Sequence, residues 1–89
     1  MNFTVAYNMD MRTEDIGWIF QNNNGDHNLI TVRCEANTPD DAISAAVSKL
    51  VSEWKENGAI ITKNFNNTIE FEFCNMMYRA SNFRALCLI

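Results

Sequence analysis

One well-marked helix constrains this 89-residue chain more than any other feature of its sequence. The run Thr38-Pro39-Asp40-Asp41 supplies an N-cap, a proline for the first helical position and two carboxylates for the positive end of the helix dipole. Apolar residues then recur at spacings of three and four, on the stripe formed by Ile43, Val47, Leu50, Val51 and Trp54. Asn57-Gly58 can adopt the left-handed backbone conformation that commonly ends a helix. The pattern predicts one long amphipathic helix over about residues 39–57.

The residues after this helix predict antiparallel strands. Residues 59–63 and 68–73 read as two strands joined by a turn at 64–67. Strict alternation in the second strand places Ile69, Phe71 and Phe73 toward the helix and places Thr68, Glu70 and Glu72 outward. Residues 76–79 are expected to extend the same strand past an irregularity at 74–75. A last strand is expected over 83–89, after a turn at 80–82.

The N-terminal third is less clearly patterned. Residues 2–7 and 29–36 alternate like strands, whereas the segment 12–28 is compatible with either a strand or a short helix. We favour a strand over 16–21, because the polar loop after it then closes a hairpin with 29–36. The fold class predicted is α+β, in the order β-β-β-α-β-β-β, with an antiparallel sheet of four to five strands covered on one face by the helix.

Size and charge limit the classes of function. The chain is shorter than the usual domain of about 100 to 150 residues, so we expect one domain over 1–89 and no large cofactor-binding fold. Eleven acidic residues against seven basic ones give a net charge of −4 and a pI near 4.7. This balance disfavours non-specific binding to nucleic acid or anionic membranes. With no apolar run near the roughly 18 residues of a membrane span, we expect a cytoplasmic protein.

No group of residues predicts catalysis, a metal site or a cofactor. The single histidine, His27, lies in an Asn- and Gly-rich loop with Asp26, where two adjacent ligands are too few for a metal site. Cys34, Cys74 and Cys87 are odd in number and have no C-x-x-C spacing, so we expect reduced and mostly buried thiols. We therefore predict a protein that is not an enzyme and binds no metal and no cofactor.

Charged side chains suggest two binding surfaces. The pairs Tyr78-Arg79 and Phe83-Arg84 would stack a nucleic-acid base if they lay side by side across a last hairpin. Glu70 and Glu72 project from one face of a strand, about 6.6 Å apart, which resembles the spacing of charge along a phosphate backbone. Further acidic residues join the expected partner-binding set, which consists of Glu35, Asp40, Asp41, Glu70 and Glu72. Glu35 joins Glu70 and Glu72 only if its strand is their neighbour.

The arrangement around the helix resembles known families. A strand ending at Val32–Ala36, then Asn37–Ala42 opening an Ala-rich amphipathic helix, then a hairpin, resembles the β-β-α-β-β layout of small phage-encoded anti-CRISPR inhibitors over residues 29–74. The Thr-Pro-Asp-Asp-Ala start is also similar to the helix entry of HicB-type antitoxins and of many ferredoxin-like domains.

The first resemblance implies a non-enzymatic inhibitor that blocks a host nuclease or nucleoprotein complex, such as CRISPR-Cas, from the host cytoplasm. The alternatives are an antitoxin or regulatory module that forms a homodimer, and a small nucleic-acid-binding domain. A partner with a basic surface follows from the acidic set of residues, because complementary charge steers association.

Overall fold

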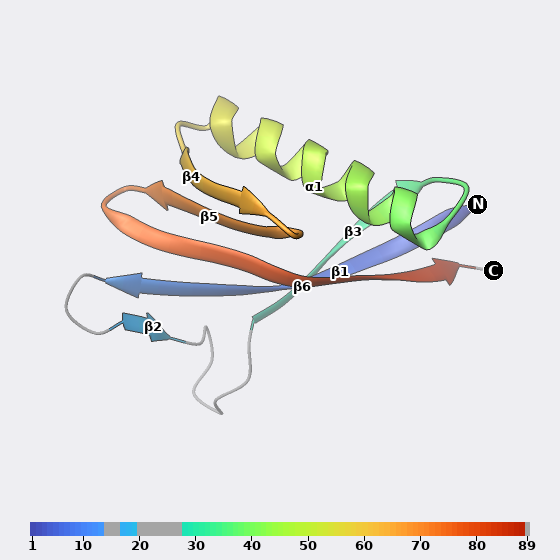
Figure 1. Ribbon diagram of the computed structural model, residues 1–89, viewed down its shortest axis with the longest axis horizontal. Helices are drawn as coiled ribbons and strands as arrows, with labels where there is room; N and C mark the ends of the chain where they lie inside the picture. The colour runs from blue at the N-terminus through green and yellow to red at the C-terminus, as the bar shows by residue number, and fades with distance from the viewer. Residues whose placement is uncertain (14–16, 20–27, 89) are drawn as a thin grey trace.

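The computed structural model describes residues 1–13, 17–19 and 28–88, and it places one helix across an antiparallel sheet (Figure 1). The fold class is therefore the α+β arrangement that the sequence predicts. Six strands occur in the described residues. In chain order the elements are β1 (Asn2–Thr13), β2 (Gly17–Ile19), β3 (Asn28–Glu35), α1 (Pro39–Glu56), β4 (Ile60–Phe65), β5 (Thr68–Phe73) and β6 (Met76–Leu88).

The helix α1 begins and ends through the caps that its sequence predicts. The Thr38 hydroxyl accepts a hydrogen bond from the Asp41 backbone N–H at 3.1 Å, which satisfies one of the free donors of the first turn. Asn57 caps the other end, and Gly58 follows with a φ of +97°, a conformation that favours glycine. The prediction of a helix at about 39–57 is confirmed.

Strand β1 organises the sheet, because it pairs with three other strands. Both β2 and β3 pair with one side of β1, and β6, β5 and β4 follow in that order on its other side. The predicted hairpin between 16–21 and 29–36 is wrong, since β2 and β3 each pair with β1. Alternation shows which face of a strand is buried but not which strand lies beside it, so the sequence pattern carried no information on this pairing.

Two tight turns close the hairpins after the helix. Asn66 and Asn67 have φ values of 52° and 56°, and Cys74 and Asn75 have φ values of 52° and 65°. Left-handed conformation at both central residues is the property of type I′ turns, whose twist matches that of the paired strands. Residues 76–79 therefore do not extend β5. The chain reverses at Cys74-Asn75, and they begin β6 instead.

The predicted turn at 80–82 is also wrong. β6 continues through these residues, and its pairing with β1 shifts register between Ala6 and Asn8. Asn82, with a φ of 57°, lies at this irregularity. An asparagine tolerates the left-handed region equally well in a turn and in a bulge, which is why the sequence alone did not distinguish the two.

The core lies between α1 and the sheet. Ala42 and Ala46 of the helix are fully buried against Phe3 and Val5 of β1, so small side chains bring the helix close to the centre of the sheet. Toward the carboxyl end of the helix, mostly larger side chains fill the space between helix and sheet. They form a second core cluster, which consists of Tyr7, Met9, Val47, Leu50, Ile69, Phe71 and Ala80.

The helix is too short to cover the whole sheet. Its 18 residues rise by about 27 Å at 1.5 Å per residue, whereas the molecule is 43 Å long. Figure 1 shows α1 ending beside the start of β4, while β6 runs on beneath it. One end of the helix-facing surface is consequently left without a helical cover.

The other face of the sheet carries a row of alternating charges. Asp10, Arg79, Glu70 and Lys63 occupy paired positions on β1, β6, β5 and β4. Arg79 Nη2 lies 3.7 Å from Asp10 Oδ2, and Lys63 Nζ lies 3.7 Å from Glu70 Oε2. Opposite charges at facing positions stabilise adjacent strands, so this row stabilises the pairing of β1, β6, β5 and β4.

We expect Arg79→Met to lower the free energy of unfolding by about 2–3 kcal/mol, because it removes the cation beside a buried carboxylate. Asp10 is only 2% exposed, whereas Arg79 is 33% exposed, which moderates the loss. Urea denaturation measures the difference. Arg84→Met is the matched control, since Arg84 is exposed on the same strand and donates to the Asn82 carbonyl. It should change stability by about 0.5 kcal/mol or less. Equal small losses in both variants would contradict the structural role of Arg79.

Candidate functional site

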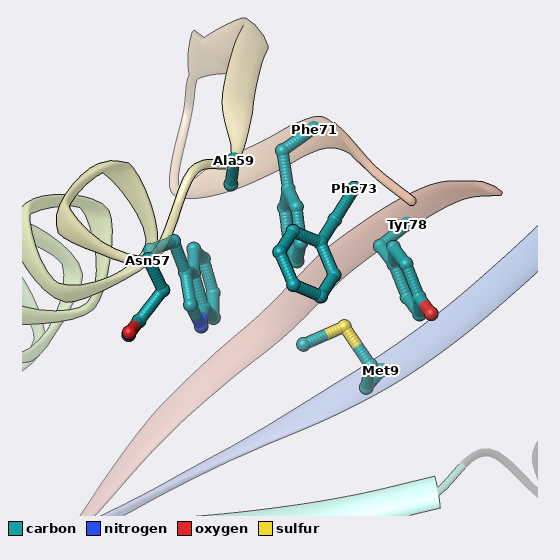
Figure 2. Close-up of a pocket in the computed structure, with 7 residues that line it drawn as sticks. Met9, Asn57, Ala59, Phe71, Phe73 and Tyr78 are labelled. Carbon is teal, nitrogen blue, oxygen red and sulfur yellow. The ribbon is translucent and has the colours of Figure 1, made fainter. Parts of the chain in front are cut away.

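A pocket opens where α1 ends and the sheet continues. Its volume is 480 Å³, and it is lined by Met9, Trp54, Asn57, Ala59, Phe71, Phe73 and Tyr78. We call this feature the aromatic pocket. Figure 2 shows Phe71, Phe73 and Tyr78 extending in the same direction from β5 and β6, toward Met9 of β1. The lining is mostly apolar, which is typical of binding sites.

Local structure explains why the pocket forms at this place. Ala59 N–H donates to the Trp54 carbonyl at 2.8 Å, so the chain turns back sharply after the last helical turn. The turn leaves Phe73, at the end of β5, beyond the reach of the helix. Phe73 is 39% exposed, although its position in the alternation places it on the helix-facing side.

The aromatic rings of the pocket are held in a stack. Trp54 and Phe71 lie 4.5 Å apart between ring centroids at an interplanar angle of 24°, and Phe71 and Tyr78 lie 5.2 Å apart at 15°. Such pairs stabilise by about 0.5–1.5 kcal/mol each beyond the burial of their area. The Tyr78 hydroxyl also contacts Met76 Sδ at 4.0 Å. The rings are therefore fixed by the fold itself, in positions that a ligand can use without rearrangement.

Tyr7 extends this arrangement toward the helix. Its ring packs edge-on against Trp54 at 6.4 Å and stacks on Phe83 at 4.9 Å. Burial, and secondarily the negative charge of Glu53, raise the pKa of the Tyr7 phenol above its ordinary value of 10.0. The charge of Glu53 therefore acts on the ring of Tyr7, which packs against Trp54 in the lining of the aromatic pocket.

The five acidic residues predicted for partner binding do not form one surface. Glu70 and Glu72 lie on the open face of β5, as the alternation predicts, while Asp40 and Asp41 lie in the first turn of α1, on the other layer of the molecule. Glu35 is exposed on β3, which pairs with β1 and is separated from β5 by both β1 and β6. The set therefore divides into the pair Glu70 and Glu72, the pair Asp40 and Asp41, and Glu35 alone. Glu70 is already paired with Lys63.

The two aromatic-basic steps are also separated from each other. Tyr78 and Phe83 point into the aromatic stacks on the helix side, while Arg79 faces Asp10 and Glu70 on the opposite face. Both steps lie on the single strand β6, so they do not face each other across a hairpin. This arrangement removes the base-stacking surface that the sequence suggested.

The remaining sequence predictions concern a metal site, a membrane span and the three cysteines. Asp26 and His27 lie outside the described residues. Within the described ranges no three His, Cys, Asp or Glu side chains group as metal ligands, and no helix there is long and apolar enough to cross a membrane. Cys34 is partly buried, but Cys74 and Cys87 are exposed, so the expectation of mostly buried thiols is wrong for these two. Cys74 is exposed because it occupies the β5–β6 turn.

The sequence pattern does not predict the aromatic pocket, although it places two of the lining residues correctly. Trp54 and Phe71 pack at the interface between helix and sheet, as the pattern predicts. The signal that could have predicted the pocket is the length of the helix relative to the strands. A helix that stops at Gly58 cannot reach the end of a strand that runs to Phe73, and this comparison could have identified the exposed ring.

Comparison with known proteins gives no further identification: no family model, no curated protein and no solved structure matches this chain.

We expect the Tyr7 phenol to titrate above pH 10.0 in an ultraviolet absorbance titration, taken as the difference between the wild type and Tyr7→Phe. Because the unfolded chain loses this proton at a lower pH than the folded one, the contribution of Tyr7 to stability is complete below pH 10.0 and is lost as the pH rises through the folded pKa. Glu53→Gln should lower the midpoint only partly, since burial is the larger cause. A midpoint at or below 10.0 would contradict the described environment of the ring.

Proposed function

We propose that this chain is a small, acidic, non-enzymatic protein-binding inhibitor whose partner presents a basic surface. The observation that carries the proposal is the pair Glu70 and Glu72, side by side on a sheet face that no helix covers in the described part of the chain. A net charge of −4 attracts such a partner at long range, and the open face offers a place to dock.

The class of partner follows from charge and from resemblance. Proteins that bind nucleic acid carry basic grooves, which are complementary in charge to a protein with a net charge of −4. The likeness of residues 29–74 to anti-CRISPR inhibitors supports a phage-encoded protein that occupies such a groove in a host nuclease or nucleoprotein complex, such as CRISPR-Cas, in the host cytoplasm. Direct binding of nucleic acid is the weaker alternative, because Arg79 is engaged with Asp10.

The antitoxin alternative has one observation in its favour. Within the described residues β4 pairs only with β5, and on it Ile60 and Phe65 are 62% and 66% exposed. A second copy pairing antiparallel along β4 would set Ile60 opposite Phe65 on the same face of the combined sheet. A homodimer bound to a small basic protein is the outcome that this alternative predicts.

The experiment that tests the proposal uses the tagged protein as bait in bacterial host extract, with and without nuclease treatment. The inhibitor proposal predicts that one stoichiometric nucleoprotein or nuclease partner remains bound after nuclease treatment. Retention of a small basic protein by a dimeric bait would favour the antitoxin function. Loss of every retained protein on nuclease treatment would show that nucleic acid mediated the capture.

The docking face is tested by removing two negative charges at a time. With the retained partner, we expect Glu70→Gln together with Glu72→Gln to weaken binding by about tenfold, the loss of about 1.4 kcal/mol of complementary charge. Asp40→Asn with Asp41→Asn is the matched control, since it changes the net charge equally on the other layer of the molecule. Circular dichroism checks that both variants fold. Equal weakening in both variants would assign the effect to net charge and would remove the docking site from β5.

A further inference from the structure

We propose that the aromatic pocket binds a cationic side chain, an arginine, presented by a protein partner. This inference rests on the proposed function only for the source of the arginine. The pocket, its rings and its charge are properties of the chain itself, so they can be tested without the partner.

The aromatic rings of the pocket can bind a cation. Trp54, Phe71 and Tyr78 form a continuous stack, and Trp54 and Tyr78 are only partly buried although both line the pocket. A guanidinium group is planar and stacks on such ring faces, and tryptophan is the strongest aromatic partner for a cation. Phe73 adds an exposed ring to the same pocket. Because Phe71 is buried between Trp54 and Tyr78, a ligand would contact the outer parts of those two rings and the exposed ring of Phe73.

Negative charge near the pocket favours a cation over an apolar side chain. The pocket lies at the carboxyl end of α1, where the helix dipole is negative. Two acidic residues, Glu53 and Glu56, against one basic residue, Lys55, give the last turns of the helix an excess of negative charge. Glu53 acts electrostatically on Tyr7, whose ring contacts Trp54. An apolar side chain would gain nothing from this field, whereas an arginine would.

The pocket is large enough to hold an arginine side chain. Its 480 Å³ lies within the range of about 300–1,000 Å³ for ligand sites, and its lining is apolar enough to cover the methylene stem of an arginine. Arginine and tryptophan are also the residues that most often dominate the energy of protein interfaces. The aromatic pocket is thus suited to hold the anchor of a basic partner.

The test uses three short capped peptides that differ at one residue: Gly-Arg-Gly, Gly-citrulline-Gly and Gly-Leu-Gly. Citrulline keeps the shape of arginine without its charge, and leucine is an apolar guest. Each peptide is titrated into the isotope-labelled full chain while NMR follows the Trp54 indole N–H and the Met9 and Ala59 methyl groups. We expect saturable shifts at these groups with the arginine peptide, at an affinity about fivefold above that for citrulline or leucine.

Two phenylalanine variants make the result specific. Phe73→Ala removes an exposed ring of the pocket and should abolish the shifts. Phe65→Ala removes a still more exposed ring on β4, outside the pocket, and should leave them unchanged. The amide spectrum of each variant checks its fold.

Equal affinity for all three peptides, or shifts that survive Phe73→Ala, would overturn the proposal, as would no shift at the pocket. None of these results depends on the extract experiment. If the host extract yields no basic partner while the peptide shifts appear, the proposed function fails and the arginine site stands.

Discussion

The packing of α1 across β1 is the interaction on which the rest of the structure depends. Ala42 and Ala46 bring the helix close to Phe3 and Val5, and β1 in turn pairs with three strands, so this contact fixes the centre of the molecule. Because the helix is anchored near its first turns and has only 18 residues, its last turn stops short of the end of the sheet. The aromatic pocket is a direct result of that mismatch in length.

The two faces of the sheet separate two kinds of chemistry. On the covered face, stacked rings fill the space beneath the end of the helix and leave an apolar opening at the edge of the core. On the open face, charges alternate across four strands, and most of them neutralise one another. Partner recognition as proposed would combine an arginine held in the aromatic pocket on one side with charge complementarity on the other.

Much of the fold follows from local signals, and what does not follow depends on distant contacts. The caps of α1 and the alternation of β5 could be predicted, because each is determined by residues within a few positions. The pairing of β2 and β3 with β1, and the course of the chain at Asn75 and Asn82, depend on which strands meet, which no local pattern encodes. For the same reason Glu35 could not be placed relative to Glu70, and the acidic set divides into separate regions.

Amide hydrogen exchange of the chain, free and bound to its captured partner, tests most directly whether the uncovered end of the sheet and its open face form the binding site. The account predicts slower exchange on binding at the helix end and along the β5–β6 hairpin, over residues 57–61 and 70–79, with the first turns of α1 unchanged. Protection confined to the first turns of α1 and to β3, with no change at the β5–β6 hairpin, would contradict it.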